Sequence, residues 1–322
     1  MRERDADDNE IRLGVSSCLL GEKVRYDGGH KHDRYLTDVL GRYVRFVAVC
    51  PEVEAGMGTP REPVRLVRDR ETIRMAGNTS GDDHTERMRR YARRKVAELS
   101  KLGLSGYVLK KGSPSCGMER VRTYTLKGMP AASDRGLFAA ELMRAMPLLP
   151  VEEEGRLCDP ALRENFVERV FACKRVAGLF SPRWTVGDLV AFHTREKMLI
   201  CSHEPAAEKE LGRIVAGAKR SDRARVEEAY RTLFMKTLCR PATVRRHVNV
   251  LQHMLGHFRD LLEPPPRRAL AATIEDYRNE LVPLVVPITL MRHYVELCQV
   301  GYLAHQTYLE PHPKELMLRN HV

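Results

Sequence analysis

The first half of the chain alternates short apolar runs with segments of helical periodicity. The runs with the length of strands are residues 11–15, 44–49, 106–110 and 149–152, and residues 64–75 have the pattern of a hairpin around Asp69 and Arg70. Helical spacing occupies residues 33–43, 82–102 and 136–146. Strands that alternate with helices predict an α/β domain with a mainly parallel sheet, here over residues 11–152.

The second half is predicted to be helical throughout. Its candidate helices are residues 160–179, 187–200, 204–217, 222–238, 242–262, 267–280 and 286–302, with prolines between several of them. We expect residues 153–185 to connect the two domains and residues 186–322 to form an all-α C-terminal domain.

The predicted helix 242–262 has two distinct faces. Its apolar stripe consists of Val244, Val248, Leu251, Leu255 and Phe258. Another face carries Arg245, Asn249, Gln252 and Arg259. These polar side chains are candidates for contact with RNA phosphates or base edges, although a solvated helix surface has the same pattern.

Composition places the protein among ordinary globular chains. It has 322 residues, of which 43% are hydrophobic and 30% are charged, and this length suits about two domains. No apolar stretch reaches the ~18 residues that a membrane span needs. The first ten residues, MRERDADDNE, lack the apolar core of a secretory signal, so we expect a cytoplasmic protein with no membrane partner.

The charge is positive and unevenly distributed. The formal net charge is +11, of which residues 1–160 carry +4 and the remaining residues +7, together with nine of the twelve histidines. A basic, histidine-rich second half suits a polyanionic partner, most simply a nucleic acid. A solvated basic surface is the alternative. Lys110 and Lys111 extend the positive charge into the first domain, where they are candidates for substrate contact.

Three of the eight cysteines stand where predicted strands end. Cys18, Cys50 and Cys116 each follow or terminate such a segment. The chain contains no CxxC pair, which disfavours a zinc ribbon or a thioredoxin-type site. Cytosolic thiols stay reduced, so disulfides are not expected. If the strands are parallel neighbours, the three sulfurs converge at one sheet edge. They then form either a metal or cluster site or three ordinary buried cysteines.

A count of three thiolates is informative in itself. Structural zinc sites and 4Fe–4S clusters normally take four protein ligands. With three, one iron of a cluster is left open, and such an iron is a Lewis acid that accepts a soft sulfur donor.

Polar residues accompany these cysteines. Glu52 lies two residues after Cys50 and suits either acid–base catalysis or the first turn of a helix. Ser113 and Ser115 lie in the Gly/Pro-rich turn before Cys116, and a serine hydroxyl can relay a proton or hold a carbonyl. Arg25 and Asp27 lie in the loop after Cys18 and are candidates for substrate binding.

Longer motifs give a family resemblance. The stretches IRLGVSSCLLGEKVRYDGG, VAVCPEVEAGMGTPREPVRL and GYVLKKGSPSCG resemble the thiouracil desulfidase family over residues 11 to about 152. The stretches LVAFHTREKMLICSH and HVNVLQHMLGHF look like a YbgA-type domain. The fusion of the two is similar to the tRNA 4-thiouridine desulfidases.

The resemblance implies a cofactor and roles for residues. Cys18, Cys50 and Cys116 match the ligands of a 4Fe–4S cluster that has three Cys ligands and one open iron. Glu52 matches the catalytic acid/base of the family, and Ser113 matches its catalytic serine. Arg25 and Asp27 fall within the matching motif.

The leading hypothesis for function is hydrolytic removal of sulfur from 4-thiouridine in tRNA, which gives uridine and sulfide. The implied partner is tRNA carrying 4-thiouridine, bound by the helical domain. One alternative is a desulfidase of free 2-thiouracil or of other thionucleosides. From a different class comes an iron–sulfur sensor that binds nucleic acid without catalysis. ATP-dependent insertion of sulfur is disfavoured, because the chain has no GxxxxGK[ST] loop.

Overall fold

The computed structural model describes residues 10–321 and consists of two compact units that divide between Cys158 and Asp159. The first unit is α/β and the second is helical, which confirms the predicted fold class. The division falls inside the segment 153–185 that we expected to connect the domains. Helix α4 (Pro160–Leu179) occupies most of that segment and belongs to the second unit, because it packs against α5 and α7.

The first unit is built on a fully parallel four-stranded sheet with the order β2-β1-β5-β8. Its strands are β1 (Arg12–Ser16), β2 (Arg45–Val49), β5 (Leu104–Leu109) and β8 (Val151–Glu153). The central strand β5 is buried at every position, as its apolar sequence predicts. Three of the predicted strands, β2, β1 and β5, are therefore adjacent and parallel.

A second sheet has the order β4-β3-β6-β7. Its strands are β3 (Val64–Asp69), β4 (Thr72–Gly77), β6 (Val121–Thr125) and β7 (Pro130–Asp134). The first two form the predicted hairpin, in which Arg70 adopts a positive φ of 55°. The sequence did not predict β6 and β7, because their short, polar segments lack a clear apolar alternation.

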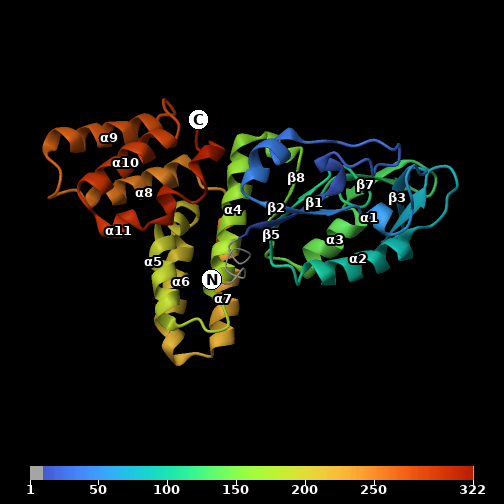
Figure 1. Cartoon of the computed structure of the whole chain (residues 1–322), viewed down its shortest axis with the longest axis horizontal. Helices are drawn as coiled ribbons and strands as arrows, with labels where there is room; N and C mark the ends of the chain where they lie inside the picture. Colours follow the sequence, from blue (N-terminus) through green and yellow to red (C-terminus); the bar gives the residue numbers. More distant parts are fainter. Residues whose placement is uncertain (1–9, 322) are drawn as a thin grey trace, which may run out of the picture. The chain divides into compact units, whose positions relative to one another are not determined.

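Helices α2 (Thr85–Leu99) and α3 (Leu137–Ala145) pack side by side against the parallel sheet (Figure 1). Their buried residues share one core with β2 and β5 that includes Tyr91, Tyr107 and Phe138. Gly14 in β1 makes room for the Tyr107 ring, because a Cβ atom there would lie 2.1 Å from a ring carbon. This packing fixes β1 against β5 and so fixes the two loops that follow them.

Four helices of the helical unit begin at an Asp or Thr residue whose side chain caps the helix. Asp159, Thr185, Asp222 and Thr243 each accept a backbone N–H bond at the start of a helix. The remaining helices are α5 (Val186–His203), α6 (Pro205–Gly217), α7 (Arg223–Leu238), α8 (Val244–Gly256), α9 (Pro264–Arg278), α10 (Val285–Leu297) and α11 (Gly301–Ala304). Within residues 10–321, none of the helices combines the length and apolarity that crossing a bilayer requires.

Two predicted helices are wrong in detail. The segment 33–43 forms a π-helical turn, Tyr35–Val39, followed by a 3₁₀ turn, Leu40–Arg42. The helix predicted over 242–262 ends at Gly256, and residues 257–262 continue as turns. Arg259 therefore does not share the α8 face with Arg245, Asn249 and Gln252. The apolar periodicity predicted a helix that was too long, because Phe258 is buried although it lies in the turn that follows the helix.

Acid is expected to destabilise the helical unit through His247. Burial lowers the pKa of His247 to about 3, against 6.5 for an ordinary histidine. Below pH 6.5 the unfolded chain binds a proton that the folded chain does not, so the free energy of unfolding falls by ~1.4 kcal/mol per pH unit. Denaturant unfolding between pH 7 and 5 should show a shallower pH dependence in His247→Gln than in the unaltered chain. His253→Gln, at an exposed position of the same helix, is the control, and equal slopes in all three proteins would contradict the assignment.

Candidate active site

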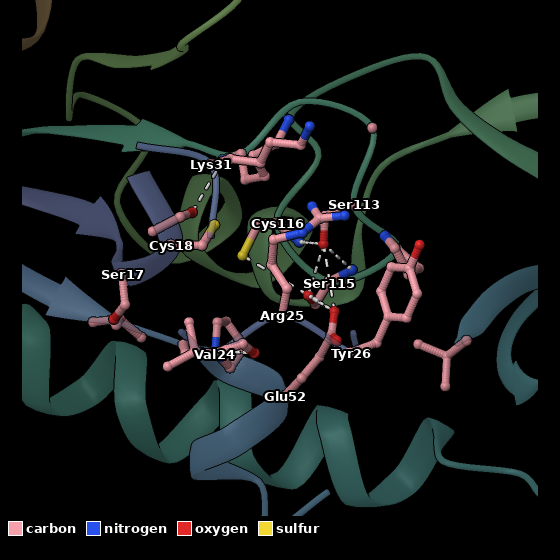
Figure 2. Close-up of a pocket in the computed structure, with 18 of the residues that line it drawn as sticks. Ser17, Cys18, Val24, Arg25, Tyr26, Lys31, Glu52, Ser113, Ser115 and Cys116 are labelled. Carbon is pink, nitrogen blue, oxygen red and sulfur yellow. Dashed lines mark hydrogen bonds between the residues drawn. The ribbon is translucent and has the colours of Figure 1, made fainter. Parts of the chain in front are cut away.

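Three thiols meet at the carboxyl edge of the parallel sheet. Cys18 lies in the 3₁₀ turn Ser17–Leu20 directly after β1, and Cys50 follows β2 at the start of the short helix α1 (Pro51–Glu54). Cys116 lies in the loop that leaves β5. All three line one cavity of about 340 Å³, and the labelled side chains around it are shown in Figure 2. This is the convergence that neighbouring parallel strands predict.

The thiols are free and shielded from solvent. Cys18 and Cys116 are buried and Cys50 is half-buried. Burial raises the pKa of Cys18 to about 11 and raises the pKa values of Cys50 and Cys116 as well, and neighbouring thiols add to the effect on Cys18 and Cys116. A bound metal centre reverses this balance, because the ligand is the thiolate and binding releases the proton.

The donor set fits an iron–sulfur cluster better than one metal ion. Among residues 10–321, no three His, Cys, Asp or Glu side chains come close enough to hold a single ion. A 4Fe–4S cluster makes a different demand, since each thiolate binds a different iron and the sulfurs need only surround a common space. Three free thiols around one cavity satisfy that demand.

Glu52 is the acidic residue of the cavity, and both of its carboxylate oxygens have partners. The Arg61 guanidinium donates to Oε2 through Nε at 3.0 Å and also through Nη2. The Ser115 hydroxyl donates to Oε1 at 2.6 Å. This arrangement compensates the buried charge and fixes the orientation of the carboxylate.

Ser113 is connected to the same carboxylate. Its Oγ lies 2.9 Å from the Ser115 Oγ and 3.5 Å from Glu52 Oε1. It also accepts the backbone N–H groups of Ser115 and Cys116, at 3.3 and 3.2 Å. Because its lone pairs receive these two donors, its own proton is directed to the other hydroxyl or to the carboxylate.

The loop that carries Ser115 and Cys116 is held by the start of α3. Phe138 and Ala139 donate their backbone N–H groups to the Ser115 carbonyl, at 3.0 and 3.1 Å. Gly136 permits this approach, since a Cβ atom there would lie 2.5 Å from the Ser115 carbonyl oxygen. The unpaired N–H groups of a helix start are thus satisfied by the loop that they position.

The four candidate substrate-binding residues are placed differently. Arg25, Lys110 and Lys111 line the cavity. Lys110 is paired with Glu154, which also accepts the Lys111 backbone N–H at 2.7 Å. Asp27 does not line the cavity. Its half-exposed carboxylate accepts the Gly29 N–H at 3.0 Å, a bond that lowers the pKa of Asp27, and it lies 3.4 Å from Arg25.

The candidate RNA-binding residues belong to the helical unit. Arg245, Asn249 and Gln252 line one recess there. Arg259, beyond the end of α8, is not part of it.

Sequence reasoning placed Ser115 beside the cysteines but did not identify its bond to Glu52, and it missed Arg61. Arg61 lies nine residues after Glu52, between Pro60 and Pro63, and nothing in that spacing predicts an ion pair. Its guanidinium is held by Glu52 on one side and by the Val24 and Gly58 carbonyls on the other, at 3.0 and 2.9 Å. The only available signal was that the segment GTPREP lies within the second family-like motif.

Comparison with known proteins defines the class to which this fold and cavity belong. Residues 13–154 match the family model described as 2-thiouracil desulfurase, and residues 197–313 match the model of DUF1722, a family of unknown function. The chain belongs to the 2-thiouracil desulfurase family through its first domain and carries a DUF1722 domain, of the YbgA type, in its second.

Individual relatives match parts of the chain. The uncharacterized protein YbgA of Escherichia coli (strain K12) is 32% identical over 153 residues, which cover 47% of this chain and 90% of the relative. The uncharacterized protein YbbK of Bacillus subtilis (strain 168) is 32% identical over 136 residues, 41% of this chain and 89% of the relative. A solved structure of the [4Fe-4S]-dependent thiouracil desulfidase TudS is similar at 36% identity, with a TM-score of 0.38 over 46% of this chain and 94% of that one.

Gly136→Ala should destabilise the first unit, because the added methyl group meets the backbone of Ser115 and Cys116. Overpacking of this kind costs ~1–3 kcal/mol and should lower the melting temperature. Gly178→Ala is the matched control in α4, where a Cβ atom meets nothing within 4 Å. It should instead raise stability slightly, as alanine does inside a helix. The two substitutions are thus expected to shift the melting temperature in opposite directions, and a Gly136→Ala protein as stable as the unaltered chain would contradict the close packing at Gly136.

Proposed function

We propose that the protein removes sulfur hydrolytically from a thiocarbonyl pyrimidine of the 2-thiouracil type. The supporting observation is the combination in one cavity of three free thiols, the Glu52 carboxylate and the hydroxyls of Ser113 and Ser115. The match of residues 13–154 to the 2-thiouracil desulfurase model agrees with this chemistry. The described dependence of TudS on a 4Fe–4S cluster supports the same cofactor here.

Cys18, Cys50 and Cys116 are the residues that would hold the cluster. A 4Fe–4S cluster with three protein ligands supplies one open iron, a Lewis acid with an affinity for the soft sulfur of a thiocarbonyl group.

The protein's own residues supply the proton transfers. Glu52 takes a proton from the attacking water, and Ser115 and Ser113 extend its hydrogen-bond chain across the cavity. Arg61 keeps the carboxylate oriented, since it occupies the oxygen that Ser115 does not. Overall, water replaces sulfur at the ring carbon, the carbonyl product forms, and sulfur leaves as hydrosulfide. No net oxidation or reduction is required.

The cavity wall also provides contacts for a flat base. Tyr26 is partly exposed and offers an aromatic face, and Val24 adds apolar surface to the lining. The Arg25 guanidinium, 5.3 Å from the Tyr26 ring centroid, can donate hydrogen bonds to an exocyclic oxygen.

A second candidate substrate is 4-thiouridine within tRNA. The net charge of +7 after residue 160 and the recess containing Arg245, Asn249 and Gln252 favour it. A base in folded RNA would have to leave its stack to reach a recessed cavity. The family match favours the free base, so we place 2-thiouracil first.

Substitution of the three thiols tests cluster binding. Cys18→Ser, Cys50→Ser or Cys116→Ser should each lower the iron content and the broad visible absorption of anaerobically reconstituted protein. Desulfidation should be lost in parallel. Cys239→Ser, an exposed cysteine of the helical unit, is the control and should behave as the unaltered chain. Full iron loading in all three variants would refute the ligand assignment.

Glu52→Gln separates catalysis from cluster binding. The variant should keep the iron content and lose turnover of 2-thiouracil by ~10²–10⁴-fold, the usual contribution of general acid–base catalysis. Sulfide release by the loaded protein is the measurement. Turnover within a factor of two of the unaltered protein would reject the role of Glu52.

Substrate preference is tested by competition between 2-thiouracil, free 4-thiouridine and thiolated tRNA. We expect turnover of 2-thiouracil that does not depend on salt. If tRNA is also a substrate, Arg245→Gln should reduce its use and weaken the salt dependence, because one phosphate contact is removed. If the variant desulfurated tRNA as fast as the unaltered chain does, and if this rate did not depend on salt, the helical unit would not select RNA.

A further inference from the structure

The helical unit contains a polar cavity of about 250 Å³ that the proposed desulfidation does not use. It lies among α4, the end of α5, the start of α8 and the end of α9. Its walls combine carboxylates and histidines with apolar and aromatic surface from Val244, Leu284 and Tyr277. This mixture is typical of a small-molecule site, in which a few polar groups orient a ligand that apolar groups enclose.

Three almost fully buried side chains on its wall keep polar atoms without a partner in residues 10–321. Tyr277 is 6% exposed, and its hydroxyl makes no hydrogen bond within that range. His247 is 7% exposed and uses Nδ1 for the Tyr308 hydroxyl at 2.9 Å, which leaves Nε2. Asn165 is 9% exposed and uses Nδ2 for the Leu238 carbonyl at 3.0 Å, which leaves Oδ1. None of these three atoms is itself fully buried. Because side chains buried to this extent normally use their polar atoms, three that leave one unused on the lining of a single cavity provide hydrogen-bonding positions for a ligand.

The remaining polar wall is held in place by its own network. Glu168 binds His203 at 2.6 Å, and the other nitrogen of His203 donates to the Arg240 carbonyl at 2.6 Å. Glu164 binds His321 at 2.8 Å, and Arg319 lies 3.4 Å from both carboxylates. These side chains are therefore prepositioned. Each of the four carboxylate oxygens already has one His or Arg neighbour, and each can accept a further hydrogen bond from a ligand. A ligand with N–H donors complements this wall.

A second recess adjoins this cavity, since Val244 and Glu280 line both. It contains Arg245 and Arg278 with the amides of Asn249 and Gln252. Arg278 is paired with Glu275 at 2.9 Å, whereas Arg245 has no ion pair within residues 10–321. The two recesses together offer acceptors and an aromatic ring at one end and a free cation with amide donors at the other.

From this juxtaposition we infer that the helical unit binds a nucleotide whose base carries an amino group. The base, an adenine or a cytosine, accepts a hydrogen bond from the Tyr277 hydroxyl at a ring nitrogen, and its amino group donates to Asn165 Oδ1. Its phosphate lies in the adjoining recess and contacts Arg245. Uracil lacks the exocyclic amine and fits the acceptor-rich wall less well. The nucleotide is either free or part of an RNA strand, since the chemistry of both is the same.

Titration calorimetry on the full chain tests the site, with AMP, UMP, adenosine and a short oligoadenylate as probes. AMP should bind saturably and at least threefold tighter than UMP. Tyr277→Phe removes one hydroxyl and should weaken the binding of AMP about threefold to tenfold. Arg245→Gln should weaken the binding of AMP but not that of adenosine, because adenosine has no phosphate. Arg268→Gln removes an exposed charge from α9 outside the recess and should leave all affinities unchanged.

The oligoadenylate identifies the source of the nucleotide. Tighter binding than AMP, weakened by both Tyr277→Phe and Arg245→Gln, supports an RNA strand, and equal affinities support a free nucleotide. Failure of both AMP and the oligoadenylate to saturate at millimolar concentration would overturn the inference. So would AMP binding that survives both substitutions or that UMP matches. Turnover of 2-thiouracil is measured separately, so such a failure leaves the proposed desulfidation standing.

Discussion

The candidate active site depends on the parallel alignment of three adjacent strands. Because β2, β1 and β5 run in the same direction, the segments that follow them meet at one edge, and each segment brings one thiol. Cys18, Cys50 and Cys116 are far apart in the chain, and only this topology unites them. The close contact of Gly14 with Tyr107 fixes the first and third strands, and the start of α3 fixes the loop of Cys116.

A second constraint is the balance of charge in a cavity shielded from water. A buried carboxylate needs a counter-charge and hydrogen bonds, and Arg61 and Ser115 supply both to Glu52. The resulting chain from Glu52 through Ser115 to Ser113 lies beside the three thiols. The helical unit treats its buried charges in the same way, since Glu168 is enclosed by His203 and Arg319. There, however, several polar atoms on the cavity wall have no partner among the described residues 10–321.

The sequence predicted what periodicity and strand ends encode. The parallel strands, the hairpin at Arg70 and most helices follow from apolar patterns and from the prolines between helices. The grouping of Cys18, Cys50 and Cys116 followed from their places after strands. The pairing of Arg61 with Glu52 depends on tertiary geometry, so spacing could not reveal it. Arg259 was misplaced because an apolar stripe continues past Gly256 although the helix does not.

The central claim is that water replaces the sulfur of the substrate in a reaction that takes place in the cavity lined by the three thiols. The most direct measurement follows 2-thiouracil in oxygen-18-labelled water with the anaerobically reconstituted chain. The account predicts one labelled oxygen in the uracil product for each sulfide released. Sulfide release without incorporation of the label, or intact 2-thiouracil in the presence of a fully loaded cluster, would contradict it.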